Sequence, residues 1–511
     1  MTDSTAATSA WDELKALPRP RLNELFAADS GRVGLLSAKL EIPEGEILFD
    51  WSKTHLDAAH IAGFEKLTAA MDFHGRRAAM FNGEHINTTE DRAVEHTALR
   101  GVGKETSVEE AEALKLRMRG LVDAIYAGTL GEVRHVISIG IGGSALGPRL
   151  GVDALGGGED GIDVHIVSNI DGVALEDALD WCDPETTLIA VASKTFTTTE
   201  TMINAQSAIE WLEDNGVADP YGRVIALTAD PEKAVEWGVD ETRILPFSES
   251  VGGRYSLWSS IGFPIAVAIG WDGFQDFLDG AAAVDRHFRD NDGLANLPLR
   301  AAWADLLYTH LRGTQTRACF AYDQRLDLLP DYLQQLEMES NGKRVTIDGA
   351  LLEGPSAPIT WGGVGTDAQH AVFQLLHQGK VLVPVDFIAC IAPGDNLDPA
   401  HHRTLLQNCF AQGAALMAGK PAQGTDKLAE ARAYPGDRPS ATILLDDLTP
   451  ASLGALIAFH EHRTVSNGIL LGINSFDQFG VELGKEIAKS IDKGGSFDAS
   501  TEALLKAAGI K

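Results

Sequence analysis

The fold is decided by the stretch VRHVISIGIGGSALGP, residues 133–148. It opens with a near-continuous apolar run and continues into Gly142, Gly143 and Ser144. Such a run is typical of a strand that is buried on both faces of a parallel sheet. The glycine turn predicts a loop at the carboxyl end of that strand, which is where open parallel sheets bind ligands.

Further apolar runs follow at intervals that leave room for helices. The first block contains DVHIVSN, TTLIAVAS, RVIALTAD and TRILPF, and after the helical stretch FQDFLDGAAAVDRHFRD a second block contains TRACFAY, APITWGG, KVLVPVDFIA and NGILLGINSF. Strands alternating with helices predict βαβ units. We therefore expect the α/β class, with two tandem doubly wound parallel sheets, a helical N-terminal segment and a C-terminal helical tail. The two blocks share no residue-level repeat.

We divide the chain into four parts. The expected parts are a helical N-terminal segment packing on the second domain, a first and smaller sheet domain, a second and larger one, and a tail: residues 1–110, 111–285, 286–490 and 491–511. Within the first part, HINTTEDRAVEHTALR is expected to form a helix. The loop GTDKLAEARAYPGDRPS interrupts the second sheet domain.

Composition excludes several classes of function. The net charge of −31 argues against nucleic acid and anionic membranes as partners. The four cysteines form no CxxC pair, so we expect free thiols, a reducing compartment and no zinc site. The longest apolar runs are about half of the ~20 residues that span a membrane, and no secretory signal is visible. These features predict a soluble cytoplasmic protein.

A second polar loop, SKTFTTTET, directly follows the apolar run TLIAVA. Ser193, Lys194, Thr195 and Thr198 offer hydroxyls and one ammonium ahead of a helix expected from Glu200. Many donors and a positive charge at a helix N-terminus suit a phosphate dianion. A threonine-rich helix cap here and a plain tight turn at GIGGSALGP are the alternatives. GIGGSALGP does not spell a dinucleotide fingerprint.

Other segments place reactive side chains on helices. VGGRYSLWSS puts Arg254 after two glycines, and YLQQLEMESNGKRV puts Gln335 and Glu339 one turn apart before Asn341-Gly342. A surface arginine and a solvated glutamate are the alternatives.

Two more helices are expected towards the C-terminus. In GTDAQHAVFQLLHQ, Thr366 is the expected N-cap and His370 falls in the first turn; a core or capping histidine is the alternative. NSFDQFGVELGKEIAKS is expected to begin a helix near Asp477, with Lys485 and Lys489 on one face. A solvated lysine face is the alternative there.

Taken together, these segments closely resemble the glucose-6-phosphate isomerase (phosphoglucose isomerase) family, which is built from sugar-isomerase domains. The carriers are GIGGSALGP, SKTFTTTET, VGGRYSLWSS, QQLEMESNGK, GTDAQH and GILLGINSFDQFGVELGK, in the family's order, with MFNGEHINTTEDRAVEHTALR before them. The chain departs from the family pattern at Ala145, Thr199, Ser248 and Ser250, and WGGVGTDAQH differs from the more usual WGEPGTNGQH. None of these departures removes a catalytic group.

The resemblance implies a role for each matching residue. The phosphate site comprises Gly143, Ser144, Ser193, Lys194, Thr195 and Thr198. The groups around the reacting carbons are Arg254, Gln335, Glu339 and Gln478. His370 and Lys485 would open the sugar ring, with Glu200 supporting the histidine. In the family the histidine comes from the other subunit, so a homodimer is implied.

The implied reaction is the reversible conversion of glucose 6-phosphate to fructose 6-phosphate through a cis-enediol(ate), a step of glycolysis and gluconeogenesis. No electrons leave the substrate, so we expect neither a redox cofactor nor a metal. Glu339 would move the proton and Arg254 would face the enediolate oxygen. We also expect a locally positive pocket in the acidic surface. A non-catalytic sugar-phosphate sensor, a dinucleotide-dependent oxidoreductase and an isomerase of another hexose phosphate are the competing interpretations.

Overall fold

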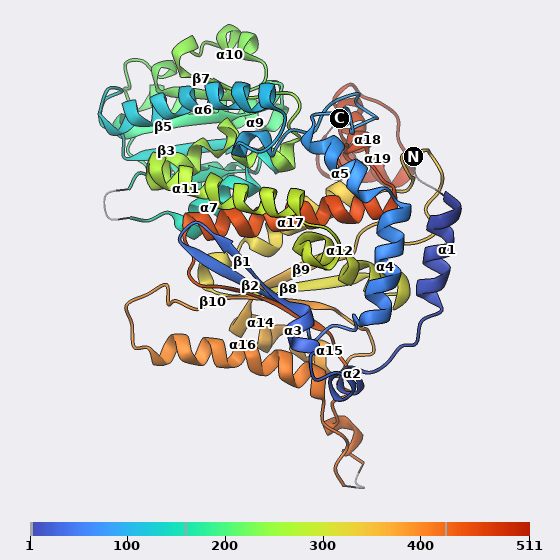
Figure 1. Cartoon of the computed structure of the whole chain (residues 1–511). Coiled ribbons are helices and arrows are strands. Elements are labelled where there is room, and N and C mark those ends of the chain that lie inside the picture. Colours follow the sequence, from blue (N-terminus) through green and yellow to red (C-terminus); the bar gives the residue numbers. More distant parts are fainter. Residues whose placement is uncertain (1–3, 159–160, 425–426, 511) are drawn as a thin grey trace. The chain divides into compact units, whose positions relative to one another are not determined.

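A computed structural model describes residues 4–158, 161–424 and 427–510 (Figure 1). The chain divides into two compact units, Met1–Ser475 and Phe476–Lys511. Both sheets belong to the first unit. The second unit contains a short 3-10 turn, η13 (Phe479–Val481), and two helices, α18 (Glu482–Asp492) and α19 (Ala499–Ala507). The α/β class with two tandem sheets is confirmed, whereas the four-part domain division stays a prediction.

The first sheet has five parallel strands in the order β4-β3-β5-β6-β7. Their bounds are Asp163–Val167, His135–Gly140, Thr187–Ala192, Val224–Thr228 and Ile244–Pro246, respectively. The chain adds β4 on one side of β3 and then crosses to add β5 on the other side. The strand order therefore reverses between β3 and β5, and such a switch point opens a crevice at the carboxyl ends of the two strands.

Helices cover both faces of this sheet, as its apolar strands predict. One face packs against α8 (Gly172–Leu179), α9 (Thr199–Asp214) and α10 (Pro231–Trp237). The other face contacts α6 (Glu105–Tyr126), α7 (Leu146–Leu155) and α11 (Phe263–Asp290). Every residue of β5 is buried, which matches its apolar sequence TLIAVA.

The second sheet has six strands in the order β1-β2-β11-β10-β8-β9. Their bounds are Ser37–Ile42, Gly45–Asp50, Ser440–Leu445, Val385–Cys390, Thr316–Tyr322 and Ile359–Val364, respectively. The four strands from β11 to β9 are parallel. They are wound in the same order as the first four strands of the other sheet, so the two halves share a winding although they share no sequence repeat.

The N-terminal region is not purely helical, and this corrects our expectation. Strands β1 and β2 form an antiparallel hairpin that pairs with β11, so the second sheet is mixed rather than wholly parallel. Leu40, Ile47 and Phe49 are the buried residues of the hairpin and alternate with more exposed ones. These short strands have one solvated face, and their weak alternation resembles a polar segment.

The remaining helices of the first unit surround the second sheet and the N-terminal region. They are α1 (Ser4–Lys15), α2 (Leu22–Ala28), α3 (Arg32–Leu36), α4 (Ala58–Ala70), α5 (Phe73–Phe81), α12 (Leu297–Leu306), α13 (Leu329–Leu333), α14 (Gly365–Ala371), α15 (Phe373–Gln378), α16 (Ala400–Ala418) and α17 (Pro450–Leu471). Helices α14, α15 and α16 cover one face of the second sheet. The long helices α11 and α17 lie side by side (Figure 1).

Two segments differ from their expected secondary structure. The first part of NGILLGINSF ends helix α17, and the missing strand is β11, with the sequence SATILL. The segment HINTTEDRAVEHTALR forms turns that close at a bridge between Asn87 and Arg92, followed by the short 3-10 turn η1 (Ala98–Arg100). A tertiary contact overrides the local helical pattern of this segment. In that contact, Asn474 Nδ2 donates a hydrogen bond to Asn87 Oδ1 at 2.9 Å.

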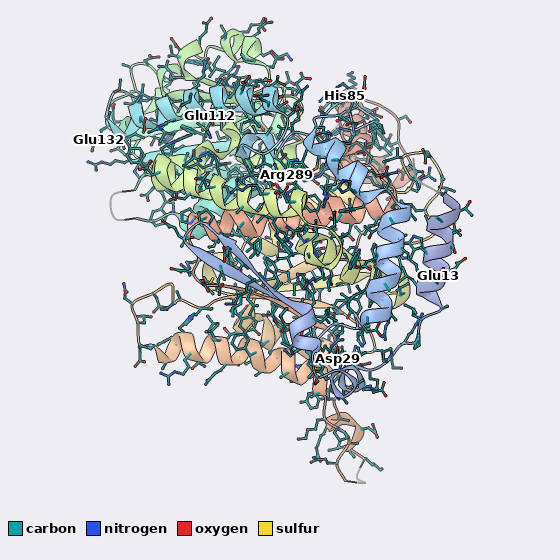
Figure 2. All side chains as sticks on the ribbon, viewed as in Figure 1. Glu13, Asp29, His85, Glu112, Glu132 and Arg289 are labelled. Atoms are coloured by element: carbon teal, nitrogen blue, oxygen red, sulfur yellow. The ribbon has the colours of Figure 1, made fainter. Side chains whose placement is uncertain are left out.

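The side chains that Figure 2 labels all lie at the surface. The labelled acids Glu13, Asp29, Glu112 and Glu132 are all exposed, as expected for a chain with a net charge of −31. Within the described ranges, no helix combines the length and the apolar character that crossing a membrane requires.

Candidate active site at the carboxyl edge of the first sheet

The two predicted phosphate loops leave neighbouring strands at the switch point. Gly140, at the end of β3, is paired in register with Ala192, at the end of β5. The loop after β3 forms a short 3-10 turn, η2 (Gly142–Ser144), and Gly142 adopts a φ of +58°. The loop after β5 continues into α9. The two segments singled out from the sequence therefore flank one crevice.

The loop after β5 is anchored by one apolar side chain and presents polar groups around it. Phe196 is buried against the core of the sheet and packs edge-on against Trp237. Ser193 Oγ lies 3.0 Å from Thr198 Oγ1. Thr198 is the N-cap residue of α9 but makes no side-chain capping bond. The amides of the first turn of α9 thus have no cap from Thr198, and amides of this kind can bind an anion.

Lys194 connects this loop to the segment that precedes Arg254. Its Nζ donates to the carbonyl oxygens of Glu249 at 2.9 Å and Val251 at 3.3 Å. Burial lowers the pKa of Lys194 below its ordinary value, and the nearby charge of Arg92 lowers it further. An anion placed beside Nζ would favour the charged form again.

Arg254 lies in the 3-10 turn η6 (Gly253–Trp258) and is almost fully buried. Its Nε donates to Ser340 Oγ at 2.5 Å, and its Nη2 donates to the carbonyl oxygen of Ser475 at 2.6 Å. Tyr255 Oη lies 2.9 Å from the same Ser340 hydroxyl. These contacts fix the plane of the guanidinium. Neither serine was singled out from the sequence, because their proximity to Arg254 is purely tertiary.

Glu339 and Gln335 face Arg254 from a widened helical turn. After α13 the helix adopts π geometry over η11 (Gln334–Glu339), which is a frequent feature of functional sites. Gln335 Nε2 donates to Glu339 Oε2 at 2.9 Å, and the same carboxylate oxygen lies 3.9 Å from Arg254 Nη1. The expected one-turn pairing is confirmed. The carboxylate is about one-fifth exposed, so it is open to a ligand.

Close packing at Gly142 and Gly143 brings the loop after β3 next to Arg254 and Gln335. A Cβ added to Gly143 would lie 2.2 Å from the carbonyl carbon of Gly253 and 2.6 Å from the amide nitrogen of Arg254. A Cβ added to Gly142 would lie 3.2 Å from Gln335 Nε2. The loop after β3, η6 and η11 are thus in direct contact.

The helix that carries Glu339 is anchored by a buried charge network. Glu337 pairs with Arg317 and accepts a hydrogen bond from Thr360 Oγ1 at 2.6 Å. Arg317 also donates to Asp305 at 2.7 Å. Burial opposes the charged form of Arg317, but the surrounding carboxylates outweigh it and raise the pKa of this guanidinium. The sequence did not indicate this network.

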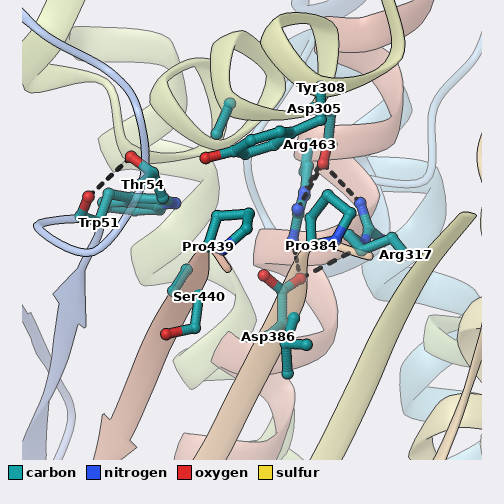
Figure 3. Close-up of a pocket in the computed structure, with 13 residues that line it drawn as sticks. Trp51, Thr54, Asp305, Tyr308, Arg317, Pro384, Asp386, Pro439, Ser440 and Arg463 are labelled. Carbon is teal, nitrogen blue, oxygen red and sulfur yellow. Dashed lines mark hydrogen bonds and ion pairs between the residues drawn. The ribbon is translucent and has the colours of Figure 1, made fainter. Parts of the chain in front are cut away.

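Arg463, on α17, completes the network by contacting Asp305 and Asp386 (Figure 3). These charged groups line one side of a small pocket, with Trp51 on the opposite side. With Glu337, the whole network contains three carboxylates and two guanidiniums. Removing one partner from such a set is costly, because the others are left incompletely paired.

His370 does not lie where the sequence analysis expected it. Helix α14 begins at Gly365 with Val364 as its N-cap, so Thr366 is not the cap and His370 lies in the last turn. The argument from the helix N-terminus therefore does not hold. The ring is exposed, and it makes no hydrogen bond or ion pair to any residue that the structure describes.

Glu200, Gln478 and Lys485 are the three remaining candidates. Glu200 is in the first turn of α9 and half-buried. Gln478 and Lys485 belong to the second unit, Lys485 on α18 and exposed. The α-helix expected to begin near Asp477 is α18, which begins at Glu482 after the 3-10 turn η13.

Comparisons with known proteins identify the family of this chain. The family model described as phosphoglucose isomerase matches residues 50–505. The glucose-6-phosphate isomerase of Novosphingobium aromaticivorans is 69% identical over 506 residues, covering 99% of each chain. That of Zymomonas mobilis is 59% identical over 511 residues, also covering 99% of each chain.

A solved structure agrees as well. The crystal structure of a glucose-6-phosphate isomerase from Chlamydia trachomatis superposes with a TM-score of 0.87, at 29% identity and with 99% of each chain covered. At this coverage the match extends over both sheets. The chain belongs to the phosphoglucose isomerase family.

Proposed function

We propose that this protein interconverts D-glucose 6-phosphate and D-fructose 6-phosphate through a cis-enediol(ate). Relatives that match nearly the whole chain are named for this activity. The observation that carries the proposal is the grouping of Glu339, Gln335 and Arg254 beside the two phosphate loops. A carboxylate and a fixed cation at one crevice suit proton transfer next to a carbonyl group.

The phosphate group would bind at the switch point. Gly143, Ser144 and the hydroxyls of the loop after β5 supply donors, with the N-terminus of α9 behind them. Lys194 adds a positive charge in a protein whose net charge is −31. Binding the remote phosphate would position carbons 1 and 2 against Glu339. We also expect Lys194, Arg92 and Arg254 to create a locally positive pocket there.

Glu339 would carry the proton. Its carboxylate removes the proton from carbon 2 of the open-chain aldose, the C–H electrons form the carbon–carbon double bond of the enediolate, and the carbonyl oxygen takes the negative charge. The hydroxyl proton on oxygen 2 moves to the negatively charged oxygen 1, the protonated Glu339 returns its proton to carbon 1, and oxygen 2 becomes the carbonyl oxygen of the ketose. Arg254 would stabilise the oxygen, because Ser340 and Ser475 already hold its guanidinium in place. Gln335 orients the carboxylate.

Ring opening would use groups outside this cluster. His370 and Lys485 would move protons between the ring oxygen and the anomeric hydroxyl, with Glu200 supporting the histidine and Gln478 contacting the sugar. His370 is exposed and makes no polar contact within the described part of its own chain. This supports its donation to the site of a second subunit, and hence a homodimer. The setting would be glycolysis and gluconeogenesis in the cytoplasm.

A coupled assay tests the proposal. Turnover of fructose 6-phosphate to glucose 6-phosphate is measured for the wild type, for Glu339→Gln and for Glu213→Gln, which changes an exposed carboxylate at the end of α9. We expect the first variant to lose activity by roughly 1,000-fold or more and the control to match the wild type. A wild-type protein that binds fructose 6-phosphate without turning it over would instead be a sugar-phosphate sensor. Full activity in Glu339→Gln would refute the assigned base.

A further inference from the structure

A group of three metal-ligating side chains lies at the opposite edge of the first sheet. His135 is the first residue of β3, His165 lies on β4, and Cys182 follows α8. Strand β3 ends at Gly140, five residues further on, which places the candidate active site about 17 Å away along the strand. These residues therefore belong to a different part of the molecule from the site described above.

The fold itself brings the three residues together. In the parallel register, His135 is paired with Asp163 and Ile137 with His165. Because strand side chains alternate between faces, both histidines lie on the face that α8 and α9 cover. Cys182 packs against the same core. One ligand atom from each of the three side chains lies within 4.8 Å of the others.

Two ring nitrogens of this group lack the partners that buried polar atoms normally have. His135 Nδ1 and His165 Nε2 are both buried without a hydrogen-bond partner. The ring centroids are 6.3 Å apart. Burial, and then the neighbouring His135, lower the pKa of His165. A neutral imidazole with a free lone pair is the form that binds a metal.

The sulfur is the third potential ligand. Cys182 is half-buried, whereas Cys319, Cys390 and Cys409 are buried. Burial raises the pKa of the Cys182 thiol to about 11, so without a cation it stays protonated. A bound metal would reverse this preference, because the thiolate is the ligand form. On binding, the S–H proton leaves to solvent and a metal–sulfur bond forms.

We propose that His135, His165 and Cys182 form a Zn²⁺ site. Two imidazoles and one thiolate suit this borderline-soft cation, whereas Mg²⁺ and Ca²⁺ prefer oxygen ligands. Three protein ligands leave one tetrahedral position for water. The carboxylate of Asp163, the first residue of β4, adds a negative charge near His165 and Cys182, which favours a cation there. The ion would fasten edge strand β4 to the segment between α8 and β5.

The sequence gives no zinc motif, because the three ligands come from separate elements. Their spacings are set by two βα units rather than by one short loop. The expectation of no zinc site rested on the absence of a CxxC pair, and it addressed only local motifs. A site assembled across strands is visible only once the register is known.

Cobalt substitution tests the proposal on the full chain. Titration of the metal-free protein with Co²⁺ is expected to give one tetrahedral site per chain, with a thiolate-to-cobalt charge-transfer band that Zn²⁺ abolishes. Cys182→Ser and His165→Gln should each lose the band and bind Zn²⁺ roughly 100-fold more weakly or worse. Both variants should keep wild-type isomerase activity, which also shows that they are folded.

Matched controls separate this site from other histidines. His401 and His402 are neighbours in a surface hollow, and His370 is exposed. A variant with His401→Gln and His402→Gln, and a second with His370→Gln, should both bind Co²⁺ as the wild type does. On the wild type, Zn²⁺ should protect Cys182 from iodoacetamide, as followed by mass spectrometry. Binding that survives Cys182→Ser, or that disappears with His401 and His402, would overturn the proposal, as would unchanged alkylation of Cys182.

Discussion

Adding one methyl group at Gly143 would force two loops of the candidate site apart. The new Cβ would lie 2.2 Å from the carbonyl carbon of Gly253 and 2.6 Å from the amide nitrogen of Arg254. Carbon atoms in ordinary contact are about 3.5 Å apart. Both obstacles are backbone atoms and cannot rotate away, so the loop after β3 and η6 would have to separate by about 1 Å.

The separation would move Arg254 relative to the phosphate loop. A misplacement of about 1 Å in a catalytic constellation can cost roughly 100-fold in rate. We therefore expect Gly143→Ala to lower kcat/KM by about 100-fold. Overpacking at one site typically costs only about 1–3 kcal/mol of unfolding free energy, so the variant should remain folded.

The coupled isomerase assay, together with urea unfolding, measures both effects. Gly252→Ala is the matched control, because its Cβ would meet only Tyr255 Cδ2, at an ordinary 3.7 Å. The control should stay within roughly 3-fold of the wild type. If Gly143→Ala kept nearly full activity, or if Gly252→Ala lost as much, the contact between the two loops would not be what positions Arg254.

Three further substitutions test other parts of the account. Lys194→Met should raise KM for fructose 6-phosphate by roughly 10- to 100-fold with a smaller effect on kcat, because it removes a charged contact to the phosphate; an unchanged KM would exclude Lys194 from the site. Thr360→Val removes the hydroxyl that donates to Glu337 at 2.6 Å, so urea unfolding should show a loss of about 1–3 kcal/mol, and kcat should fall with KM unchanged; equal stability would contradict the anchoring role. His287 accepts a hydrogen bond from the amide of Leu297, and burial lowers its pKa from 6.5 to about 4. Between these two pH values the unfolded state therefore binds more protons than the folded state. The contribution of His287 to the free energy of unfolding is complete above pH 6.5 and should fall by about 2 kcal/mol at pH 5. His287→Gln keeps an acceptor and should lose that part of the pH dependence in urea unfolding at pH 7 and pH 5; an unchanged dependence would contradict the assignment.

The first sheet was predictable because its strands are buried on both faces. Long apolar runs such as TLIAVA read as strands without tertiary information, and the polar loops after β3 and β5 mark their carboxyl ends. The helix with Gln335 and Glu339 was also predictable from its stop at Asn341-Gly342. Where local pattern and final environment agree, sequence reasoning succeeds.

The features that the sequence did not predict correctly depend on contacts between distant parts of the chain. The β1–β2 hairpin has only a few buried residues, and it becomes a sheet edge only because β11 offers a partner. The cap of α14 was placed at Thr366, although the helix begins one residue earlier at Gly365. The support of Arg254 by Ser340 and Ser475 joins residues that are far apart in the chain. No local pattern encodes such contacts.

Hydrogen exchange in D₂O tests the central claim, the assignment of Glu339 as the group that carries the proton between carbons 1 and 2. When fructose 6-phosphate is incubated with the wild type in D₂O, deuterium should enter carbon 1 and NMR should detect it, because a carboxylic acid exchanges with solvent before it returns the proton. Glu339→Gln should abolish this exchange while the variant still binds the sugar phosphate. Deuterium entering carbon 1 at the wild-type rate in Glu339→Gln would contradict the account.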